Sequence, residues 1–475
     1  MSVSVIPSKY LGKMGYTIYK DGLTPKEYKL IKDNLTVAPY IPKSPVQPEK
    51  YKIYLESQSK YYLPRYFGIQ HFGEPESYCI SKGDPIQVEF VGSLRTNQLP
   101  IVDAYLSKVN DRTGGGGLLD VPCGWGKTAM ALYICSQLKV KTLVIVHKSF
   151  LVNQWIERIE EFLPSARIGK IQGKEIDIQN KDIVIGMLQS LSVKHYSEDT
   201  FTSFGFTIVD ECHHISSEVF SQSLTRIVTK YTLGLSATMT RKDGLTHVFK
   251  MFLGDVVYAV KRIADDTVLV KTLLYDSKDD EFKETIYDHR GNPQYSTMIT
   301  KICDYNERSE FILQVLHHEL THTKEQQIMI LAQNKSILTY LYDAIVYRNL
   351  GSVGYYMGGM KESQLKESET KQIVVATYAM ASEGLDIKTL TTLLFATPRT
   401  DITQSVGRIL RVKHNRPLIV DILDTHDVFQ RQYKKRLAYY KKNKYTVMVS
   451  DNTRYFTDTW NAPSVTKSAK CMISI

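Results

Sequence analysis

Two series of short apolar runs, separated by helical or polar segments, mark most of the chain after residue 90. The first series has runs at residues 117–121, 141–147, 182–187, 206–210 and 231–237. The second has runs at 267–276, 327–333, 352–358, 371–379, 391–397 and 416–424. Runs of this length with polar ends are typical of strands buried on both faces of a parallel sheet. Because segments with helical spacing lie between them, the pattern predicts two α/β domains in tandem.

The remaining segments suggest the domain boundaries. Residues 1–90 are weakly periodic and rich in Tyr, Pro and Lys, and we interpret them as a small N-terminal module. Within and just after it we expect a helix that begins after Thr24 and a strand at 83–92. We place the two α/β domains at 91–260 and 261–445. Residues 446–475 read as a short polar tail with no clear element.

Composition excludes several classes of protein. The 475 residues carry 60 Lys and Arg against 50 Asp and Glu, a formal charge of +10, which fits either a solvated basic surface or a polyanionic partner. Six cysteines include no C-x-x-C pair, so neither a zinc ribbon nor a thioredoxin motif is indicated. Neither a signal-peptide core nor an apolar run of about 18 residues is visible. We therefore expect an intracellular protein with no membrane partner.

The stretch "LLDVPCGWGKTAM" (118–130) follows a predicted strand and opens a predicted helix, which is the context of a phosphate-binding loop. Gly124 and Gly126 allow backbone N–H groups to turn toward phosphate oxygens. Lys127 can reach the β- and γ-phosphates, and Thr128 can offer its hydroxyl to magnesium. The full pattern would place a glycine at Val121, so only its second half is present. We predict binding of ATP with Mg²⁺ at this loop.

Five consecutive metal-binding side chains, "DECHH" at 210–214, end another predicted strand. A carboxylate at the carboxyl end of a parallel strand faces the crevice where ligands bind, so Asp210 can hold magnesium through water. Glu211 can then orient and polarise an attacking water. A zinc site is the alternative, but neighbouring residues of a strand point to opposite faces and no second ligand cluster completes a tetrahedron. His213 and His214 are either polar packing residues or, for His213, a coupler between the ATP site and the second domain.

Together these motifs resemble those of superfamily 2 helicases. "PCGWGKT", "DECHH" and "LGLSATMTRKDG" resemble motifs I, II and III, and "LRTNQ" (94–98) and "VHKSFLVNQW" (146–155) resemble the Q motif and motif Ia. "TYAMASEGLDI" (377–387) and "QSVGRILR" (404–411) resemble motifs V and VI. The combination is most similar to the branch of XPB-type helicases, phage recombination helicases and the poxvirus transcript-release helicase. That resemblance implies two RecA-like domains and is compatible with a large DNA virus as the source.

The resemblance also implies a role for each matching residue. Gln98 would read adenine with Arg95 nearby, and Gly384 and Asp386 would help to bind ATP. Ser236 and Thr238, with His213, would couple hydrolysis to domain motion. Gln404, Arg408 and Arg411 would face the γ-phosphate from the second domain, where a guanidinium neutralises charge that develops during phosphoryl transfer.

Nucleic acid would lie across both domains, opposite the ATP cleft. The expected contacts are Lys148, Asn153, Gln189 and Ser190 in the first domain and Thr377 and Tyr378 in the second. The segment "QRQYKKRLAYYKKNKY" (430–445) is either a solvated helix face or a surface for phosphate contact with some stacking.

These expectations amount to an ATP-hydrolysing enzyme that moves along or unwinds nucleic acid, with DNA favoured over RNA. An RNA-directed helicase is the first alternative. The second is an accessory factor of transcription or repair machinery that remodels complexes without separating strands. A nucleotide-binding scaffold without turnover is disfavoured, because Lys127, Asp210, Glu211 and Arg408 are all present.

Overall fold

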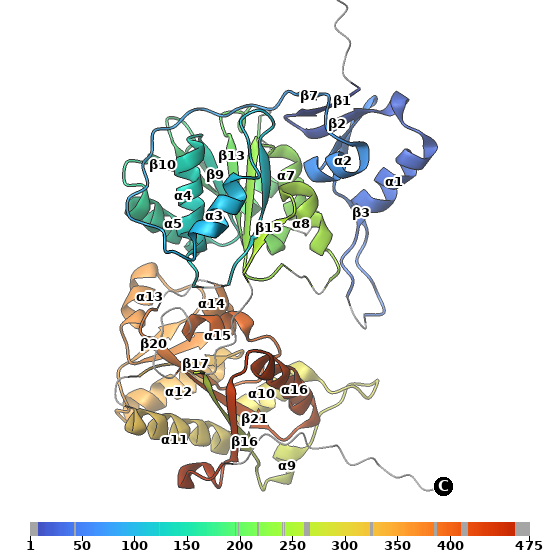
Figure 1. The fold of residues 1–475 in the computed structure, drawn as a ribbon. Coiled ribbons are helices and arrows are strands. Elements are labelled where there is room, and N and C mark those ends of the chain that lie inside the picture. The colour runs from blue at the N-terminus through green and yellow to red at the C-terminus, as the bar shows by residue number, and fades with distance from the viewer. Residues whose placement is uncertain are drawn as a thin grey trace, which may run out of the picture. The chain divides into compact units, whose positions relative to one another are not determined.

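The computed structural model divides the chain into two compact units, residues 1–261 (unit 1) and 262–475 (unit 2). It describes residues 8–41, 44–122, 124–194, 196–197, 199–215, 218–239, 241, 243–260, 267–323, 326–383, 387–409 and 417–460. Each unit contains a mainly parallel sheet with helices on both faces, so the predicted fold class is confirmed (Figure 1). Among the described residues, no helix is long and apolar enough to cross a membrane.

Unit 1 begins with a small module built around an antiparallel sheet of strand order β5-β6-β2-β1-β7. The predicted cap at Thr24 is present, because its hydroxyl accepts from the Glu27 N–H at the start of the first helix. The elements of the module are β1 (Lys9–Gly12), β2 (Gly15–Tyr19), η1 (Lys20–Gly22), α1 (Pro25–Leu35), β3 (Thr36–Val37), β4 (Tyr51–Lys52), β5 (Leu55–Glu56), β6 (Lys60–Leu63), α2 (Arg65–Phe72) and β7 (Ser77–Tyr78).

The rest of unit 1 forms an eight-stranded sheet of order β11-β10-β12-β9-β13-β14-β8-β15, parallel except for the β10–β11 pair. Its elements are α3 (Leu99–Leu106), β8 (Gly115–Asp120), α4 (Lys127–Leu138), β9 (Thr142–Val146), α5 (Ser149–Phe162), β10 (Ile168–Gln172), β11 (Glu175–Ile176), β12 (Ile183–Met187), α6 (Leu188–Val193), β13 (Phe206–Asp210), η2 (Cys212–Ile215), α7 (Glu218–Arg226), β14 (Tyr231–Ser236), α8 (Thr246–Leu253) and β15 (Val256–Ala259).

Alternation along the central strands of unit 1 explains its two apolar layers. In β9, Val144 and Val146 pack into the core under α3, α4 and α5. Leu143 and Ile145 point the other way, into the core shared with α6, α7, α8 and the N-terminal module. Since both faces are covered, the strands are apolar throughout, as the short runs in the sequence predicted.

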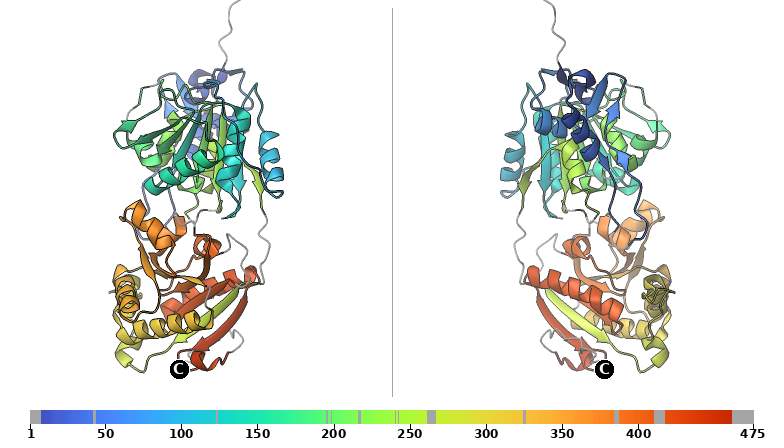
Figure 2. Two further views of the ribbon diagram at one scale, coloured as in Figure 1. Left: turned by 90° about the vertical axis from the view of Figure 1, so that its left-hand side faces the viewer. Right: turned by 90° about the vertical axis from the view of Figure 1, so that its right-hand side faces the viewer.

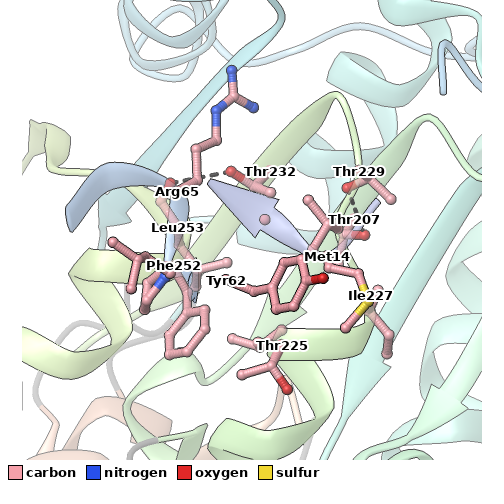
Figure 3. Close-up of a pocket in the computed structure, with 15 residues that line it drawn as sticks. Met14, Tyr62, Arg65, Thr207, Thr225, Ile227, Thr229, Thr232, Phe252 and Leu253 are labelled. Carbon is pink, nitrogen blue, oxygen red and sulfur yellow. Dashed lines mark hydrogen bonds between the residues drawn. The ribbon is translucent and has the colours of Figure 1, made fainter. Parts of the chain in front are cut away.

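The N-terminal module shares a hydrophobic core with the parallel sheet, since Tyr16 and Phe67 join the same buried cluster as Phe249. Arg65 of α2 adds polar contacts, because its guanidinium donates to the carbonyl oxygens of Lys230 and Thr113, both at 2.8 Å. Between module and sheet lies a cavity of about 30 Å³, large enough for about one water (Figure 3). It lies apart from the predicted ATP-binding residues.

The strand predicted at 83–92 is wrong. Ile86 and Val88 are buried, but the segment makes only an isolated bridge, between Pro85 and Val140. Its N–H groups bond to the ends of helices instead, with Ile86 donating to Lys139 O and Val91 donating to Phe162 O. The alternating apolar residues therefore cover the core without joining a sheet.

Unit 2 has a seven-stranded parallel sheet of order β18-β19-β17-β20-β21-β16-β22. Helices α10, α11 and α12 pack on one face and α14, α15 and α16 on the other. Its elements are β16 (Leu269–Tyr275), α9 (Asp280–Lys283), α10 (Tyr295–Asp304), α11 (Asn306–His322), β17 (Gln327–Ala332), α12 (Lys335–Tyr347), β18 (Val353–Tyr356), α13 (Glu362–Glu369), β19 (Ile373–Thr377), α14 (Tyr378–Glu383), β20 (Leu390–Phe395), α15 (Thr403–Ile409), β21 (Leu418–Asp424), α16 (Asp427–Lys442), β22 (Thr446–Asp451) and η3 (Tyr455–Thr457).

The expectation that residues after 445 lack a clear element is wrong for their first part. Residues 446–451 form β22, which pairs with β16 from Leu269 to Leu274 at the edge of the sheet. Tyr455, just beyond it, is fully buried in the core of unit 2. These residues therefore complete unit 2 rather than trail from it.

Candidate active site

The predicted phosphate-binding loop joins β8 to α4. Gly124 and Gly126 have φ angles of 83° and 76°, a left-handed backbone that favours glycine, while Cys123 lies outside the described residues. Gly126 caps α4, which begins at Lys127, so the N–H groups of the first turn are directed toward the loop. A helix N-terminus of this kind is suited to bind phosphate.

Lys127 connects this loop with the carboxylates of the "DECHH" stretch. Its Nζ lies 3.3 Å from the carbonyl oxygen of Val121 and 3.7 Å from Oε1 of Glu211. Thr128 follows in the first turn of α4 and is partly exposed. The ammonium group and the carboxylate predicted to act in catalysis are therefore adjacent in this structure.

Gln98 lies beneath the loop and is only 4% exposed. Its Nε2 donates to the carbonyl oxygen of Trp125 at 2.7 Å, and its Oε1 accepts from the Arg95 N–H at 2.8 Å. A Cβ on Gly126 would come within 2.5 Å of Nε2, so this glycine permits the close approach. The side chain of Gln98, the residue predicted to read adenine, thus holds the backbone of the phosphate-binding loop.

Asp210 ends β13 on the sheet face that α5 covers, because it shares that face with Phe206 and Ile208. Trp155 of α5 donates its indole N–H to Oδ2 of Asp210 at 3.0 Å, and the Glu211 N–H donates to Oδ1 at 3.0 Å. Burial and then the negative charge of Glu211 raise the pKa of Asp210, while the bond from Trp155 opposes this rise. The carboxylate is therefore held in one orientation in a site that favours a nearby cation.

His213 contacts the end of β14 within unit 1. Its Nδ1 lies 2.9 Å from Oγ of Ser236 and 3.5 Å from Oε2 of Glu211. The Ser236 hydroxyl donates to the carbonyl oxygen of Thr238 at 2.9 Å. Burial lowers the pKa of His213, which keeps its imidazole neutral near pH 7. The residues predicted to couple hydrolysis to motion therefore form one hydrogen-bonded group with Glu211.

Three residues of this site, Trp155, Arg241 and Asp243, make contacts that the sequence did not predict. The Arg241 guanidinium donates to the backbone oxygen of His213 and pairs with the carboxylate of Asp243. The backbone oxygen of Asp243 in turn accepts from the Tyr40 N–H of the N-terminal module at 3.0 Å. Arg241 and Asp243 thus link motif II to that module.

The zinc alternative requires ligands that converge. Cys212 is fully buried in the hydrophobic core, and burial raises its pKa well above the usual value. His213 instead reaches Ser236, as described above. These two candidate ligands therefore diverge.

The predicted nucleic-acid contacts of unit 1 lie at the same sheet edge as the ATP-site residues. Lys148 follows β9 and Gln189 follows β12, two adjacent strands in which Met187 pairs with Val146. Asn153 and Gln189 are exposed, Lys148 is partly buried, and the hydroxyl of Ser190 accepts from the Gly173 N–H at 2.9 Å. Lys148 and Gln189 thus follow the carboxyl ends of two adjacent parallel strands, and Asn153 and Ser190 lie in the helices that come next, α5 and α6.

Several predicted residues of unit 2 can be placed only in part. Gln404 is partly exposed on α15, and the backbone of Arg408 belongs to the same helix. Gly384, Asp386 and Arg411 lie outside the described residues.

The prediction for Tyr378 is wrong, whereas Thr377 at the end of β19 is partly exposed. The Tyr378 side chain is 1% exposed, and its hydroxyl donates to the carbonyl oxygen of Thr397 at 2.6 Å. It is a core residue of unit 2 and not a surface contact.

The Lys- and Tyr-rich segment at 430–445 forms most of α16. Tyr433, Tyr440 and Tyr445 are buried, as is Arg436, so the stacking that one of the two interpretations of this segment included is excluded for these three rings. The lysines are exposed.

Comparisons with known proteins agree with the motifs. A family model described as the res subunit of type III restriction enzymes matches residues 92–241. "Putative ATP-dependent RNA helicase L396" of Acanthamoeba polyphaga mimivirus is 35% identical over 466 residues, covering 94% of this chain and 89% of that protein. "DNA 3'-5' translocase XPB2" of Sulfurisphaera tokodaii is 27% identical over 383 residues, covering 72% and 84%. The match to the solved structure of T4 UvsW covers 90% of this chain and 96% of the UvsW chain, with 17% sequence identity and a TM-score of 0.35.

Proposed function

Because the chain belongs to the superfamily 2 helicases and is an ATP-hydrolysing nucleic-acid helicase or translocase, we propose that it moves along DNA. The motif combination supports DNA, since it resembles the XPB-type branch, and one relative is named a DNA translocase. RNA is the second candidate, favoured by the name of the 35% identical mimivirus relative. We further propose an intracellular site of action, in the nucleus, the cytoplasm or a viral factory, with transcription or repair machinery as partners.

The observation that carries the proposed chemistry is the 3.7 Å approach of Lys127 to Glu211 at the start of α4, the helix that Gly126 caps. In this arrangement Lys127 would neutralise phosphate charge, and Glu211 would accept a proton from the attacking water.

Two residues near Lys127 and Glu211 also fit Mg²⁺. Thr128 offers a hydroxyl and Asp210 an oriented carboxylate, and both are hard oxygen ligands of the kind that magnesium prefers. When bound, the ion would neutralise charge on the phosphate oxygens. The chain's own contribution is to fix Asp210 through Trp155 and through the Glu211 N–H.

The roles of the second domain extend the same proposal. Gln404, Arg408 and Arg411 would supply polar and cationic groups to the γ-phosphate, with Gly384 and Asp386 forming part of the ATP site. This division of the site between two domains would make hydrolysis depend on their closure, so that each ATP drives one cycle of opening and closing. His213, Ser236 and Thr238 would relay the state of Glu211, to which the Ser236 hydroxyl lies 3.5 Å away.

The test compares ATP hydrolysis with single-stranded, duplex and branched DNA and with RNA of matched length. We expect DNA to stimulate turnover more than RNA. If RNA stimulates ATP hydrolysis as much as DNA or more, the proposal that the protein moves along DNA is wrong.

Variants test the site separately from the track. Glu211→Gln should bind ATP but lose turnover by about 100-fold or more, because general-base catalysis contributes at least that much. Lys127→Ala should lose both binding and turnover, while the exposed Glu160→Gln serves as the control. Turnover by Glu211→Gln near that of the control would refute the assignment of the base.

A further inference from the structure

Helix α16 is locked onto the sheet of unit 2 by a buried polar group. Arg436 and Asp421 both have fully buried side chains and form two hydrogen bonds, of 2.8 and 2.9 Å. Arg436 also donates to the carbonyl oxygen of Arg399 at 2.9 Å, and the Tyr440 hydroxyl donates to Asp421 at 2.9 Å. Because a buried charge that loses its partner is strongly destabilising, this group fixes which face of α16 points outward.

The outward face of α16 carries a basic stripe that is interrupted between Lys435 and Lys441, where no basic side chain is exposed. Its members are exposed and are spaced three, four and seven positions apart, so they share one side of the helix. From Arg431 to Lys442 the stripe is about 16 Å long at 1.5 Å per residue. Figure 2 shows α16 as the long orange-red helix that packs along the sheet of unit 2. We define the stripe by Arg431, Lys434, Lys435, Lys441 and Lys442, with Lys444 just beyond the helix.

The basic residues of the stripe do not stabilise helix α16. In the part of the chain that the structure describes, no carboxylate lies within 4 Å of any of its cations. Asp427, in the first turn, is the only acidic residue of the helix. Like charges three and four residues apart, such as Arg431 with Lys434 and Lys435, each destabilise a helix by about 0.2–0.5 kcal/mol. An arrangement that costs helix stability and has no internal partner indicates an external anion.

We propose that the basic stripe of α16 is an accessory surface that binds the phosphate backbone of nucleic acid. Extended nucleic acid offers a regular row of negative charges, which matches a straight row of cations. Tyr433 and Tyr440 are buried and cannot stack on bases, and contacts from the cations to phosphate carry no sequence information, so the stripe binds without sequence preference. The proposal rests on nucleic acid as the partner and is independent of whether that partner is DNA or RNA.

Salt dependence of binding tests the stripe directly. The full-length variant with Lys434, Lys435 and Lys441 each changed to Gln is compared with a control in which Lys278, Lys283 and Lys335, also exposed in unit 2, are changed to Gln. Affinity is measured by fluorescence anisotropy for duplex DNA, single-stranded DNA and RNA between about 50 and 200 mM salt. The slope of log K against log salt should become shallower by about 0.9 per lost contact on duplex and about 0.7 on single strands.

The outcomes separate the possible explanations. The variant with Arg at all three stripe positions should keep the wild-type slope, and ATP hydrolysis without nucleic acid should stay unchanged in every variant. An unchanged slope in the Gln variant, or an equal loss in the control, would overturn the proposal. Binding of the wild-type protein to RNA alone would refute DNA as the track, yet the stripe could still be tested on RNA.

Discussion

Arg241 donates a hydrogen bond from its guanidinium to the backbone carbonyl oxygen of His213. The same guanidinium is held by the carboxylate of Asp243, whose own backbone oxygen accepts from Tyr40. Motif II is thereby tied to the N-terminal module through Arg241 and Asp243, two residues of the motif III stretch.

Arg241→Ala should lower kcat more than it changes KM for ATP, because Arg241 positions His213 and Glu211 without lying at the phosphate-binding loop. A hydrogen bond to a charged group contributes about 1.5–3 kcal/mol, so we expect a loss in kcat of about 10-fold to 100-fold. Steady-state kinetics of ATP hydrolysis measure the split. The control is Arg226→Ala on α7, and an effect confined to KM would argue against a positioning role.

Trp155→Phe should leave the Asp210 carboxylate less firmly oriented and should therefore weaken the binding of Mg²⁺. The ring still fills the core position, but the N–H that bonds to Oδ2 is lost. Groups that orient a metal ligand typically change metal affinity or activity by about 10-fold to 100-fold. Titration of ATP hydrolysis with Mg²⁺ should show a higher half-saturating concentration. Trp460→Phe in unit 2 is the matched control, and identical Mg²⁺ curves for the two variants would contradict the expectation.

Arg308 and Asp424 form a second buried ion pair in unit 2, with no exposed area on either side chain. Arg308→Ala should destabilise unit 2 by about 3–5 kcal/mol, because it leaves a buried carboxylate without its partner. Urea unfolding followed by circular dichroism measures the loss. The double variant Arg308→Met with Asp424→Leu should recover much of the stability, since no charge then remains buried. A double variant as unstable as the single one would show that packing, not charge, dominates there.

Glu56 should make the stability of the N-terminal module depend on pH. Burial raises its pKa, but hydrogen bonds from Lys20 and Lys52 and the charge of Lys32 outweigh this and lower the pKa to about 2. A carboxyl group with a lowered folded-state pKa stabilises the protein above its unfolded pKa of about 4.3, and this contribution is lost as the pH falls toward 2.

Glu56→Gln should therefore lower Tm near pH 7. The corresponding loss in the free energy of unfolding is about 1 kcal/mol or less, because the Glu56 carboxylate is partly solvated. The difference from wild type should shrink between about pH 5 and pH 2. Glu175→Gln, which removes one exposed pair with Lys170, should change Tm little at any pH. A difference for Glu56→Gln that grows on acidification would contradict the assignment.

The order of strands and helices could be predicted because buried parallel strands produce short apolar runs. The phosphate-binding loop could be predicted because its backbone geometry requires glycines beside a lysine. The contact from Trp155 could not, because it depends on which helix covers which face of the sheet. The burial of Tyr378 could not be predicted for a related reason: a residue directly after a strand can turn inward as easily as outward.

Errors at the edges of the two sheets have different physical causes. Residues 83–92 alternate as a strand would, yet Pro85 has no N–H to donate and the neighbouring N–H groups bond to helix ends. Residues 446–451 are only partly buried, so their pattern is weak although they form β22. Segment 430–445 contains both basic and aromatic residues. Which of them face solvent depends on how the helix is oriented on the sheet, and the sequence does not show this orientation.

The pairing of β22 with β16 joins the last described strand of unit 2 to its first. On a ribosome, the sheet of unit 1 has all its strands once residue 259 has emerged, whereas β16 must wait for residues 446–451. Domains generally fold as units during synthesis, the N-terminal one first. Unit 1 can therefore fold early, while unit 2 keeps an open edge on β16 until translation is nearly finished.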